Sequence, residues 1–256
     1  MSSEHVAIDA VLALVRQAGA AIMDIYGGEH AVEFKADSSP LTAADKASHA
    51  IIAAGLKALT PAVPVLSEEG RDIPYAERRN WDQLWLVDPL DGTKEFLKRN
   101  GEFTINVALI REGRPFFGVV GVPAQDRLYW GVTGKGSWLT EQGRLPQPIA
   151  VRPADRERGL TVVQSRSHPS PETAEYLAKI KVAEAVEVGS ALKFCIIAEG
   201  RADLYPRLGP TMEWDTAAGQ AVVEAAGGRV MTLDGASLRY NKEDLLNPHF
   251  VVSGFF

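Results

Sequence analysis

Apolar residues recur at helical spacing in two stretches near the N-terminus of the chain. One stretch covers roughly residues 4–26 and the other about residues 41–59. Such spacing is typical of the buried stripe of an amphipathic helix. Thr42 stands where it would cap the second helix. The pattern therefore predicts two helices that each pack one face on a core, with a short strand-like piece at residues 32–35 between them.

Short apolar runs bounded by turn residues predict strands in the middle of the chain. These runs cover residues 65–66, 85–87, 104–122 and 128–130, with turns at Glu112-Gly113 and Pro123. The first two strands run straight into acidic residues. Gly134-Lys-Gly136 lacks the spacing and the following helix of a nucleotide-binding loop, so we interpret it as a hairpin turn.

The polar, proline-bearing segment from about residue 145 to 159 is the best candidate for a domain boundary. Beyond it, predicted strands and helices alternate. The strands fall near residues 160–164, 186–188, 229–233 and 249–253, and the helices near 171–180, 190–200 and 215–226. This order predicts an N-terminal α+β subdomain, residues 1–150, followed by a C-terminal α/β subdomain, residues 151–256.

Composition narrows the class of protein. The 256 residues are 46% hydrophobic and 23% charged, as in an ordinary globular protein. A net charge of −6 argues against a nucleic-acid-binding surface, because such a surface needs clustered Lys and Arg. A phosphorylated small molecule would therefore need local positive charge, either from metal ions or from a few placed basic side chains.

Cysteine use and hydropathy bear on the location of the protein. Cys195 is the single cysteine, so neither an intramolecular disulfide nor a thiolate metal site can form, which points to a reducing compartment. Its apolar surroundings, residues 192–198, predict that the thiol is buried. No run of about 18 apolar residues exists, so we expect no transmembrane helix. We expect a cytoplasmic protein, either free or peripheral at the inner face of the cell membrane.

The segment Asp88-Pro-Leu-Asp-Gly-Thr93 places two carboxylates three residues apart, directly after an apolar strand. Its proline and glycine predict a tight turn. Such a turn would aim Asp88, Asp91 and the carbonyl of Leu90 toward one point. An acidic turn by itself is more often a solvated surface loop than a metal site.

Two more acidic positions share this ambiguity. Glu68 and Glu69 end another predicted strand, and Asp215 is placed to be a metal ligand or simply a helix N-cap. If all these carboxylates meet, they repel one another and raise their own pKa values unless cations are bound. Mg²⁺ prefers oxygen ligands and works with phosphate. Zinc is less suitable, because the five histidines show no H-E-x-x-H spacing.

Three segments resemble the signatures of the inositol monophosphatase superfamily. They are Leu86-Val-Asp-Pro-Leu-Asp-Gly-Thr93, Trp214-Asp-Thr-Ala-Ala-Gly219 and Glu224-Ala-Ala-Gly-Gly228, with Thr42-Ala-Ala-Asp45 and Glu68-Glu69 at the expected places upstream. The resemblance extends over nearly the whole chain. It implies a layered αβαβα sandwich that combines the α+β and α/β halves, of the sugar-phosphatase type.

The resemblance also implies roles for single residues. Mg²⁺ would be held by Glu68, Asp88, the Leu90 carbonyl, Asp91 and Asp215. Thr93 and Asp45 would orient and deprotonate the attacking water. Without the other motifs, the sequence around Asp45 would predict an ordinary surface residue on a helix. Glu69 would act in support of these ligands or serve a purely structural purpose.

Other segments are similar to the 3'(2'),5'-bisphosphate nucleotidase branch of that superfamily. They are Asp91-Gly-Thr-Lys-Glu-Phe96, Gln164-Ser-Arg-Ser-His168, Val188-Gly-Ser-Ala-Leu-Lys-Phe-Cys195 and Ala198-Glu-Gly-Arg-Ala-Asp-Leu-Tyr-Pro-Arg207. The implied reaction converts adenosine 3',5'-bisphosphate to AMP and phosphate in sulfur metabolism, with inhibition by lithium. The metal cluster can hold only the phosphate being cleaved, so the second phosphate needs its own cations.

By the same resemblance, Ser190, Lys193 and Arg207 would recognise substrate phosphate and sugar, His168 would lie close to the nucleotide, and Thr93 and Asp215 would also touch the substrate. Local alternatives remain for three of them. Lys193 could extend to solvent, Arg207 is expected in an irregular stretch, and His168 could be a hydrogen-bonded loop residue.

Three alternatives concern the whole protein. It could be an inositol-1-phosphate or fructose-1,6-bisphosphate phosphatase with the same metal chemistry, or a non-catalytic regulatory protein that binds a phosphorylated ligand. The complete set of carboxylates argues against the last. The sequence is equally compatible with a monomer and a homodimer.

Overall fold

The computed structural model describes residues 3–27, 32–34, 40–70, 72–141, 143–167 and 170–254. Helical segments in this part of the chain are α1 (Ser3–Tyr26), α2 (Ala43–Leu59), η1 (Glu68–Gly70), α3 (Tyr75–Arg78), α4 (Thr93–Leu97), η2 (Pro123–Gln125), α5 (Pro171–Leu177), α6 (Leu192–Ala198) and α7 (Glu213–Ala225). Strands are β1 (Val32–Phe34), β2 (Pro40–Thr42), β3 (Val65–Ser67), β4 (Gln83–Asp91), β5 (Thr104–Arg111), β6 (Arg114–Val122), β7 (Arg127–Val132), β8 (Gly136–Glu141), β9 (Gln147–Ile149), β10 (Leu160–Ser165), β11 (Val182–Val188), β12 (Leu204–Arg207), β13 (Arg229–Thr232) and β14 (Phe250–Ser253).

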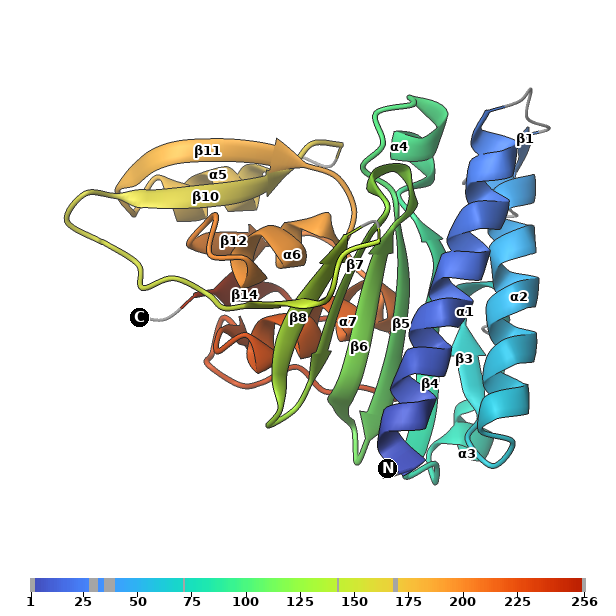
Figure 1. The fold of residues 1–256 in the computed structure, drawn as a ribbon. Helices are drawn as coiled ribbons and strands as arrows, with labels where there is room; N and C mark the ends of the chain where they lie inside the picture. The colour runs from blue at the N-terminus through green and yellow to red at the C-terminus, as the bar shows by residue number, and fades with distance from the viewer. Residues whose placement is uncertain are drawn as a thin grey trace.

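These elements stack in five alternating layers (Figure 1). α1 and α2 form the first layer, and they cover one face of a sheet of order β3-β4-β5-β6-β7-β8-β9. α6 and α7 separate this sheet from a second sheet of order β11-β10-β12-β14-β13. α5 packs on the outer face of the second sheet. The predicted αβαβα sandwich is therefore confirmed.

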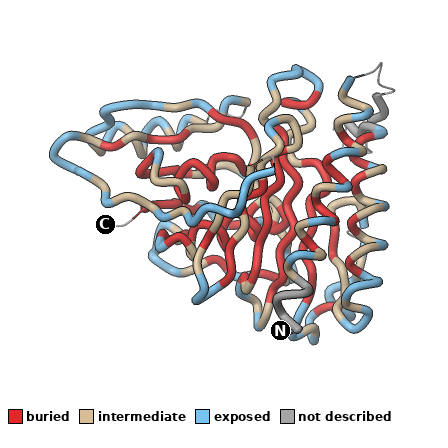
Figure 2. The backbone as a smooth tube through the Cα atoms, viewed as in Figure 1, coloured by how far each residue is buried: buried red, intermediate tan, exposed pale blue. Residues whose placement is uncertain are grey.

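Burial follows the amphipathic patterns of the sequence. Buried positions run along the central strands and the middle helices, whereas residues 144–148 pass over the surface (Figure 2). α1 and α2 turn apolar residues such as Ile22 and Ile52 toward Val107 of β5 in one continuous core. Removal of this apolar surface from water is the main driving force that holds the first helical layer on the sheet.

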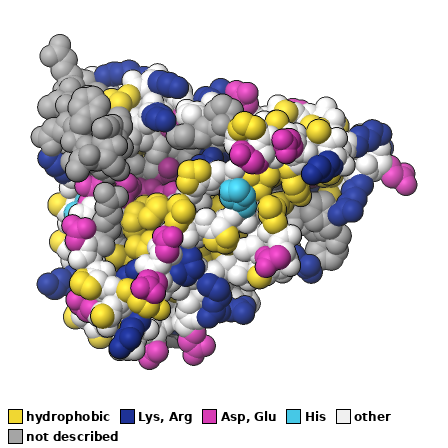
Figure 3. Space-filling view, turned by 180° about the vertical axis from the view of Figure 1, so that it is seen from behind, with side chains coloured by type: hydrophobic (Ala, Val, Ile, Leu, Met, Phe, Trp, Pro, Cys, Tyr) yellow, Lys and Arg dark blue, Asp and Glu magenta, His cyan; other side chains and the backbone are white. Residues whose placement is uncertain are grey.

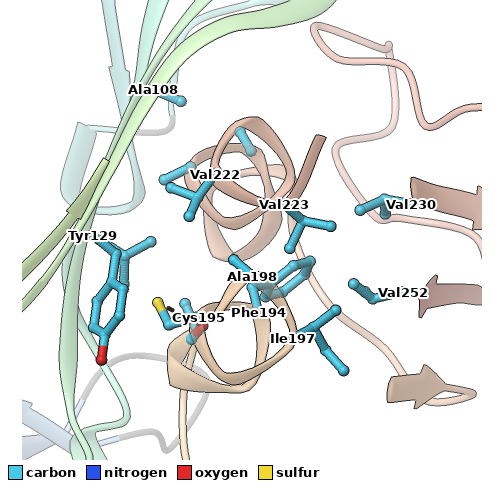
Figure 4. Packing of buried hydrophobic residues seen from close by; sticks show 14 of the residues in the cluster. Ala108, Tyr129, Phe194, Cys195, Ile197, Ala198, Val222, Val223, Val230 and Val252 are labelled. Carbon is cyan, nitrogen blue, oxygen red and sulfur yellow. Dashed lines mark hydrogen bonds between the residues drawn. The ribbon is translucent and has the colours of Figure 1, made fainter. Parts of the chain in front are cut away.

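The middle layer is packed from both sides (Figure 4). Val222 and Val223 of α7 and Phe194 of α6 lie between Tyr129 of the large sheet and Val252 of the small one. Cys195 is 0% exposed within this cluster. The prediction of a buried thiol is therefore confirmed.

α7 lies unusually close to strands β6 and β7, because glycines face it there. A Cβ on Gly118 would lie 2.6 Å from the carbonyl oxygen of Ala218, and one on Gly131 would lie 2.9 Å from that of Ala221. Real Cβ atoms do not approach backbone so closely, so only glycine fits. These two positions set the height of α7 above the sheet, and with it the position of the residues at the start of α7.

Some predicted elements were wrong in extent. β8 and β9 were not predicted, and β9 lies inside the segment interpreted as a boundary. β9 pairs only with β8 at the edge of the sheet, where a proline such as Pro148 is tolerated. The helix predicted at 171–180 ends at Leu177. Gly134-Lys-Gly136 does form the turn between β7 and β8, as predicted.

An ion pair joins the segment between the two sheets to the second sheet. Arg152 Nε and Nη2 donate to the two carboxylate oxygens of Asp203 over 2.7 and 2.8 Å, and the amide of Thr161 in β10 donates to Asp203 over 2.7 Å. Burial alone would raise the pKa of Asp203, but the hydrogen bonds from Arg152 and Thr161 outweigh it and hold this pKa below its usual value. The carboxylate form of Asp203 therefore stabilises the fold.

We expect Asp203→Asn to lower the free energy of unfolding by about 1–2 kcal/mol at pH 7, because a charge-assisted hydrogen bond is lost. The depressed pKa means that this stabilisation is present above the unfolded-state pKa, about 3.9, and is lost as pH falls below it. Urea unfolding of both proteins at pH 7 and near pH 3, below the unfolded-state pKa, measures the difference. A penalty that stays constant or grows with acidification would contradict the assignment.

The surface gives two further observations. No helix in the described ranges is both long and apolar enough to cross a bilayer. On the face seen in Figure 3, Lys and Arg side chains lie scattered among Asp and Glu side chains and form no continuous basic stripe.

Candidate active site

One cavity of about 660 Å³ collects residues from distant parts of the chain. Predicted site residues that line it are Glu68, Asp91, Thr93, Ser190, Lys193, Arg207 and Asp215. They come from η1, the end of β4, α4, the turn before α6, α6 itself, β12 and α7. The cavity is therefore built where the large sheet meets the middle helices and the second sheet.

The end of β4 is a bulged strand and not the tight turn predicted from sequence. β4 continues to Asp91, which pairs with Thr104, and its register against β5 shifts between Asp88 and Asp91. Pro89 has no N–H to donate to a ladder, and a bulge accommodates it. In a regular strand, residues three apart face opposite sides of the sheet. The irregularity lets both carboxylates approach the same region.

Asp88 and Leu90 are buried in β4 and are not among the residues that line the cavity. Asp88 is 1% exposed, and its Oδ1 accepts a hydrogen bond from the amide of Leu90 over 3.1 Å. Burial, followed by the charges of Glu68, Asp91, Asp215 and Asp45, raises the pKa of Asp88 well above its usual value. Asp88 therefore lies close enough to these four carboxylates, which come from distant parts of the sequence, to feel their charges.

α2 brings Asp45 to this cluster. Asp45 lies in the first turn of α2 and is 1% exposed, so the alternative of a surface residue is wrong. Ser48, one turn later, donates its hydroxyl to the carbonyl of Pro89 over 2.7 Å. His49 Nδ1 and the hydroxyl of Ser67 lie 3.0 Å apart, which joins α2 to the end of β3 beside Glu68.

Asp215 enters from the start of α7. The helix begins at Glu213, so Asp215 lies within its first turn and is not the N-cap. Its Oδ2 accepts from the amide of Met212 over 2.8 Å, which satisfies one of the free amides at this helix end. Burial, then the charge of Asp91, raises the pKa of Asp215 to about 8. The hydrogen bond from the Met212 amide at the helix N-terminus lowers this pKa, but burial and the neighbouring carboxylates raise it by more.

Asp91 contacts both sides of the cavity. Its Oδ2 accepts from the amide of Ala191 over 2.6 Å and from the hydroxyl of Thr104 over 3.3 Å. Burial raises the pKa of Asp91, and the charge of Lys193 partly opposes this effect. Asp88, Asp91 and Asp215 thus all have raised pKa values. A bound cation would remove the cost of ionising them together.

The donor set suits a hard metal ion. Among the described residues, no three His, Cys, Asp or Glu side chains are already arranged as a cage around one point. An ion at this place would therefore complete its coordination with water, backbone carbonyl or phosphate oxygens, as hard divalent cations commonly do. The available side chains next to it are carboxylates and hydroxyls, and the one thiol, Cys195, lies in the core.

Basic groups lie in the same cavity. Lys193 is 5% exposed, so the alternative that it extends to solvent is wrong. Its Nζ donates to the carbonyl of Ser190 over 2.6 Å and lies 5.4 Å from the ring centre of Tyr205. Burial lowers the pKa of Lys193 to about 8, although the charge of Asp91 acts in the opposite direction. A bound anion would favour its charged form.

Arg207 lies in a strand and not in the irregular stretch that was predicted. It ends β12, where it pairs with Phe250 of β14, so the expected irregular stretch is a strand. Its Nη2 donates to the carbonyl of Pro210 over 2.8 Å. The sequence hides this strand because Pro206 interrupts it. Strand pairing fixes the backbone of Arg207, which leaves the guanidinium at the cavity wall.

Ser190 packs against Gly92, the residue directly before Thr93. Gly92 has φ of +87°, and a Cβ there would lie 1.9 Å from the hydroxyl of Ser190, so no other residue fits. Ser190 has φ of +51° and donates its hydroxyl to the carbonyl of Asp91 over 3.0 Å. Thr93 begins α4 directly after this contact. His168 lies outside the described residues.

Several cavity residues were not predicted as site residues. They are Glu95, Ser165, Ser167, Ser170, Thr211 and Thr216. Glu95 is 3% exposed and accepts a hydrogen bond from the hydroxyl of Ser167. Its position two residues after Thr93, in a segment too short to show helical periodicity, gave no sign of burial.

Comparison with known proteins agrees with this architecture. The family model "Inositol monophosphatase family" matches residues 4–254. The chain is 50% identical to 3'(2'),5'-bisphosphate nucleotidase CysQ of Salmonella typhimurium, over 96% of this chain and 99% of the relative. It is 52% identical to the CysQ nucleotidase of Escherichia coli K12, with the same coverage of both.

Solved structures give the same result. The crystal structure of CysQ from Bacteroides thetaiotaomicron, a bacterial member of the inositol monophosphatase family, superposes with a TM-score of 0.84 at 44% identity and covers 96% of each chain. An inositol monophosphatase from Thermotoga maritima shares the fold, with a TM-score of 0.80 at 24% identity. The architecture, the acidic cavity and these similarities agree, and the chain belongs to the inositol monophosphatase family, whose members are metal-dependent phosphatases.

Proposed function

We propose that this protein is a 3'(2'),5'-bisphosphate nucleotidase that hydrolyses adenosine 3',5'-bisphosphate to AMP and phosphate. Relatives with that activity in their names are 50% and 52% identical over nearly their whole length. The observation that carries the proposal is a single cavity in which clustered carboxylates and two basic side chains, Lys193 and Arg207, lie together. A substrate with two phosphates needs both kinds of group.

The proposed metal is Mg²⁺, held by Glu68, Asp88, the Leu90 carbonyl, Asp91 and Asp215. The raised pKa values of Asp88, Asp91 and Asp215 support a cation at this place. When bound, Mg²⁺ supplies positive charge that polarises the phosphate and lowers the pKa of water.

The proposed roles of Asp45 and Thr93 concern the proton of the attacking water. The hydroxyl of Thr93 receives that proton and passes its own to the carboxylate of Asp45. Burial of Asp45 near Asp88 supports this role, because it places the carboxylate beside the proposed metal ligands and away from bulk water. The resulting hydroxide attacks phosphorus in line, the bond from phosphorus to the 3'-oxygen breaks, and that oxygen takes up a proton from solvent to give the 3'-hydroxyl of AMP.

The proposed site for the phosphate that stays on the product consists of Ser190, Lys193 and Arg207, with His168 near the nucleotide. Lys193 is buried, so a phosphate that reaches it interacts in a place where water screens little. Arg207 can offer two parallel N–H donors to phosphate oxygens. In this proposal the chain divides near residue 150, and the substrate lies between residues from both parts.

Phosphate release from adenosine 3',5'-bisphosphate, inositol-1-phosphate and fructose-1,6-bisphosphate, measured side by side with Mg²⁺, tests the assignment. We expect kcat/KM to be highest for the nucleotide by at least about tenfold, which corresponds to one well-placed ionic contact. A preference for either of the other substrates would assign the protein to another branch. Tight binding of the nucleotide without any turnover would indicate a regulatory protein.

Metal removal gives a separate prediction. Chelation should abolish phosphate release, and added Mg²⁺ should restore it. Because the ion binds the folded state, Mg²⁺ at about a hundredfold excess over its Kd should raise the unfolding midpoint by about 5–10 °C. Differential scanning calorimetry measures this shift. Full activity after exhaustive chelation, with no thermal response to Mg²⁺, would contradict a metal-dependent site.

A further inference from the structure

Glu102 joins three segments that are distant in the sequence. Its carboxylate accepts two hydrogen bonds from Arg166, from Nε and Nη2, each over 2.8 Å. The same carboxylate accepts a third bond, from the amide of Gly189 over 2.8 Å. Glu102 lies between α4 and β5, Arg166 follows β10 and Gly189 follows β11. A two-pronged bond to arginine fixes both partners in one plane, so this contact is strongly directional.

Arg166 is held on its other side by β11. Its Nη2 also donates to the carbonyl of Glu187 over 2.5 Å, and its amide donates to the carbonyl of Val188 over 3.3 Å. The side chain of Glu102 is 18% exposed and that of Arg166 is 40% exposed. The arginine is thus anchored to the end of β11, and through Glu102 to the segment that leads into the large sheet.

Gly189 opens the turn that carries the proposed phosphate-binding residues. The next residue, Ser190, donates to the carbonyl of Asp91, and the amide of Ala191 donates to the carboxylate of Asp91. Lys193 is held by the carbonyl of Ser190. The turn is therefore fixed at one end by Glu102 and in its middle by Asp91.

The turn leaves little space for a shift. A Cβ on Gly189 would lie 2.5 Å from Cγ of Glu95, and Ser190 has a left-handed backbone with φ of +51°. A non-glycine residue in that conformation stays there only when its surroundings hold it. Neither Glu102 nor Arg166 is among the residues that line the cavity. Any effect of theirs on a substrate is therefore indirect, through the residues that they hold in place.

We propose that Glu102 and Arg166 are a positioning pair that sets the Gly189–Ala191 turn, so that Ser190 and Lys193 meet the phosphate that remains on the product. This inference rests on the proposed nucleotidase function. The pair affects recognition of the retained phosphate, whereas Asp88, Asp91 and Asp215 act on the phosphate that is cleaved. Loss of the pair therefore weakens binding of one phosphate and leaves the reaction at the other nearly unchanged.

The test uses Glu102→Ala, Arg166→Ala and the double variant in the full-length protein with Mg²⁺. For adenosine 3',5'-bisphosphate we expect KM to rise about tenfold, since hydrogen bonds to a charged group are lost, while kcat changes less than about threefold. The double variant should be no worse than the single ones, because both remove the same contact. Glu102→Gln, which keeps the acceptor for Gly189, should recover part of the loss.

Two product inhibitors separate positioning from a general loss of structure. AMP carries only the retained phosphate, so its inhibition constant should rise with KM in the variants. Inorganic phosphate occupies the cleavage position, so its inhibition constant should stay within about twofold. Asp126→Asn is the control, because Asp126 forms a 2.8 Å ion pair away from the cavity with Arg16, whose side chain is 37% exposed against 40% for Arg166. It should leave all constants unchanged.

Each outcome decides between the proposals. If wild-type protein does not hydrolyse the bisphosphate nucleotide, the proposed function and this inference both fail. If it does, and the variants change AMP and phosphate inhibition equally, or change neither, the nucleotidase assignment stands and the positioning pair is wrong. A fall in kcat with unchanged KM also overturns the pair. Circular dichroism of each variant identifies loss of fold, in which case Glu102→Gln decides.

Discussion

Asp91→Asn should reduce kcat about 10²–10³-fold, the cost commonly found when one group that stabilises transition-state charge is removed. The change is nearly isosteric, and the asparagine carbonyl can still accept the hydrogen bond from the amide of Ala191. It deletes a negative charge that the proposed Mg²⁺ site needs. Phosphate release under saturating substrate and Mg²⁺ measures the loss.

The same variant should be at least as stable as wild type in the absence of metal. Burial raises the pKa of Asp91, so ionising this carboxyl costs stability in the metal-free fold, and asparagine removes that cost. Loss of activity with retained or improved metal-free stability would distinguish a ligand from a structural residue. Asp82→Asn, at an exposed residue just before β4 begins, is the control. Full turnover by Asp91→Asn would refute its role.

Gly118→Ala should lower the free energy of unfolding by about 3 kcal/mol or more, near the upper end of what overpacking costs. The added Cβ would lie 2.6 Å from the carbonyl oxygen of Ala218 and 2.7 Å from Cβ of Ala221, and the first of these is backbone that cannot rotate away. α7 would have to move off the large sheet. Because Asp215 stands in the first turn of α7, activity should fall even under conditions where the variant remains folded.

A second glycine provides the control. Gly19 lies within α1, and a Cβ there would meet Pro123 at 3.5 Å, which is ordinary contact. Gly19→Ala should be neutral or stabilise by up to about 1 kcal/mol, because alanine favours a helix interior over glycine. Urea unfolding of both variants gives the comparison. Equal stability of the two would show that α7 does not depend on the glycine contact.

The helices and strands of the layers were predicted well where a regular apolar spacing extends over many residues. α1, α2 and α7 carry several turns of apolar spacing, and the central strands have unbroken apolar runs, so tertiary packing agreed with local pattern. β9 and β12 failed because each contains a proline and is short. Their pairing partners, β8 and β14, determine their structure, and such partners are not visible in a local window.

The site was predictable in part, because some of its residues stand in patterns that are visible in a local stretch of sequence. Carboxylates that follow short apolar runs, such as Asp88 and Glu68, are visible in the local sequence, and the family signatures joined them to Asp215. The bulge between Asp88 and Asp91 was mistaken for a turn, because a proline and a glycine indicate either. No sequence pattern pointed to Glu102. Its importance depends on contacts with Arg166 and Gly189, which only the fold creates.

Anomalous diffraction from crystals grown with Mn²⁺, as a stand-in for Mg²⁺, and inorganic phosphate tests the central claim most directly. The account predicts metal peaks within coordination distance, roughly 2.1 Å, of carboxylate oxygens from Glu68, Asp88, Asp91 and Asp215, with phosphate bound on the same ions. Metal bound elsewhere, or phosphate held without contact to a metal beside these four side chains, would contradict it.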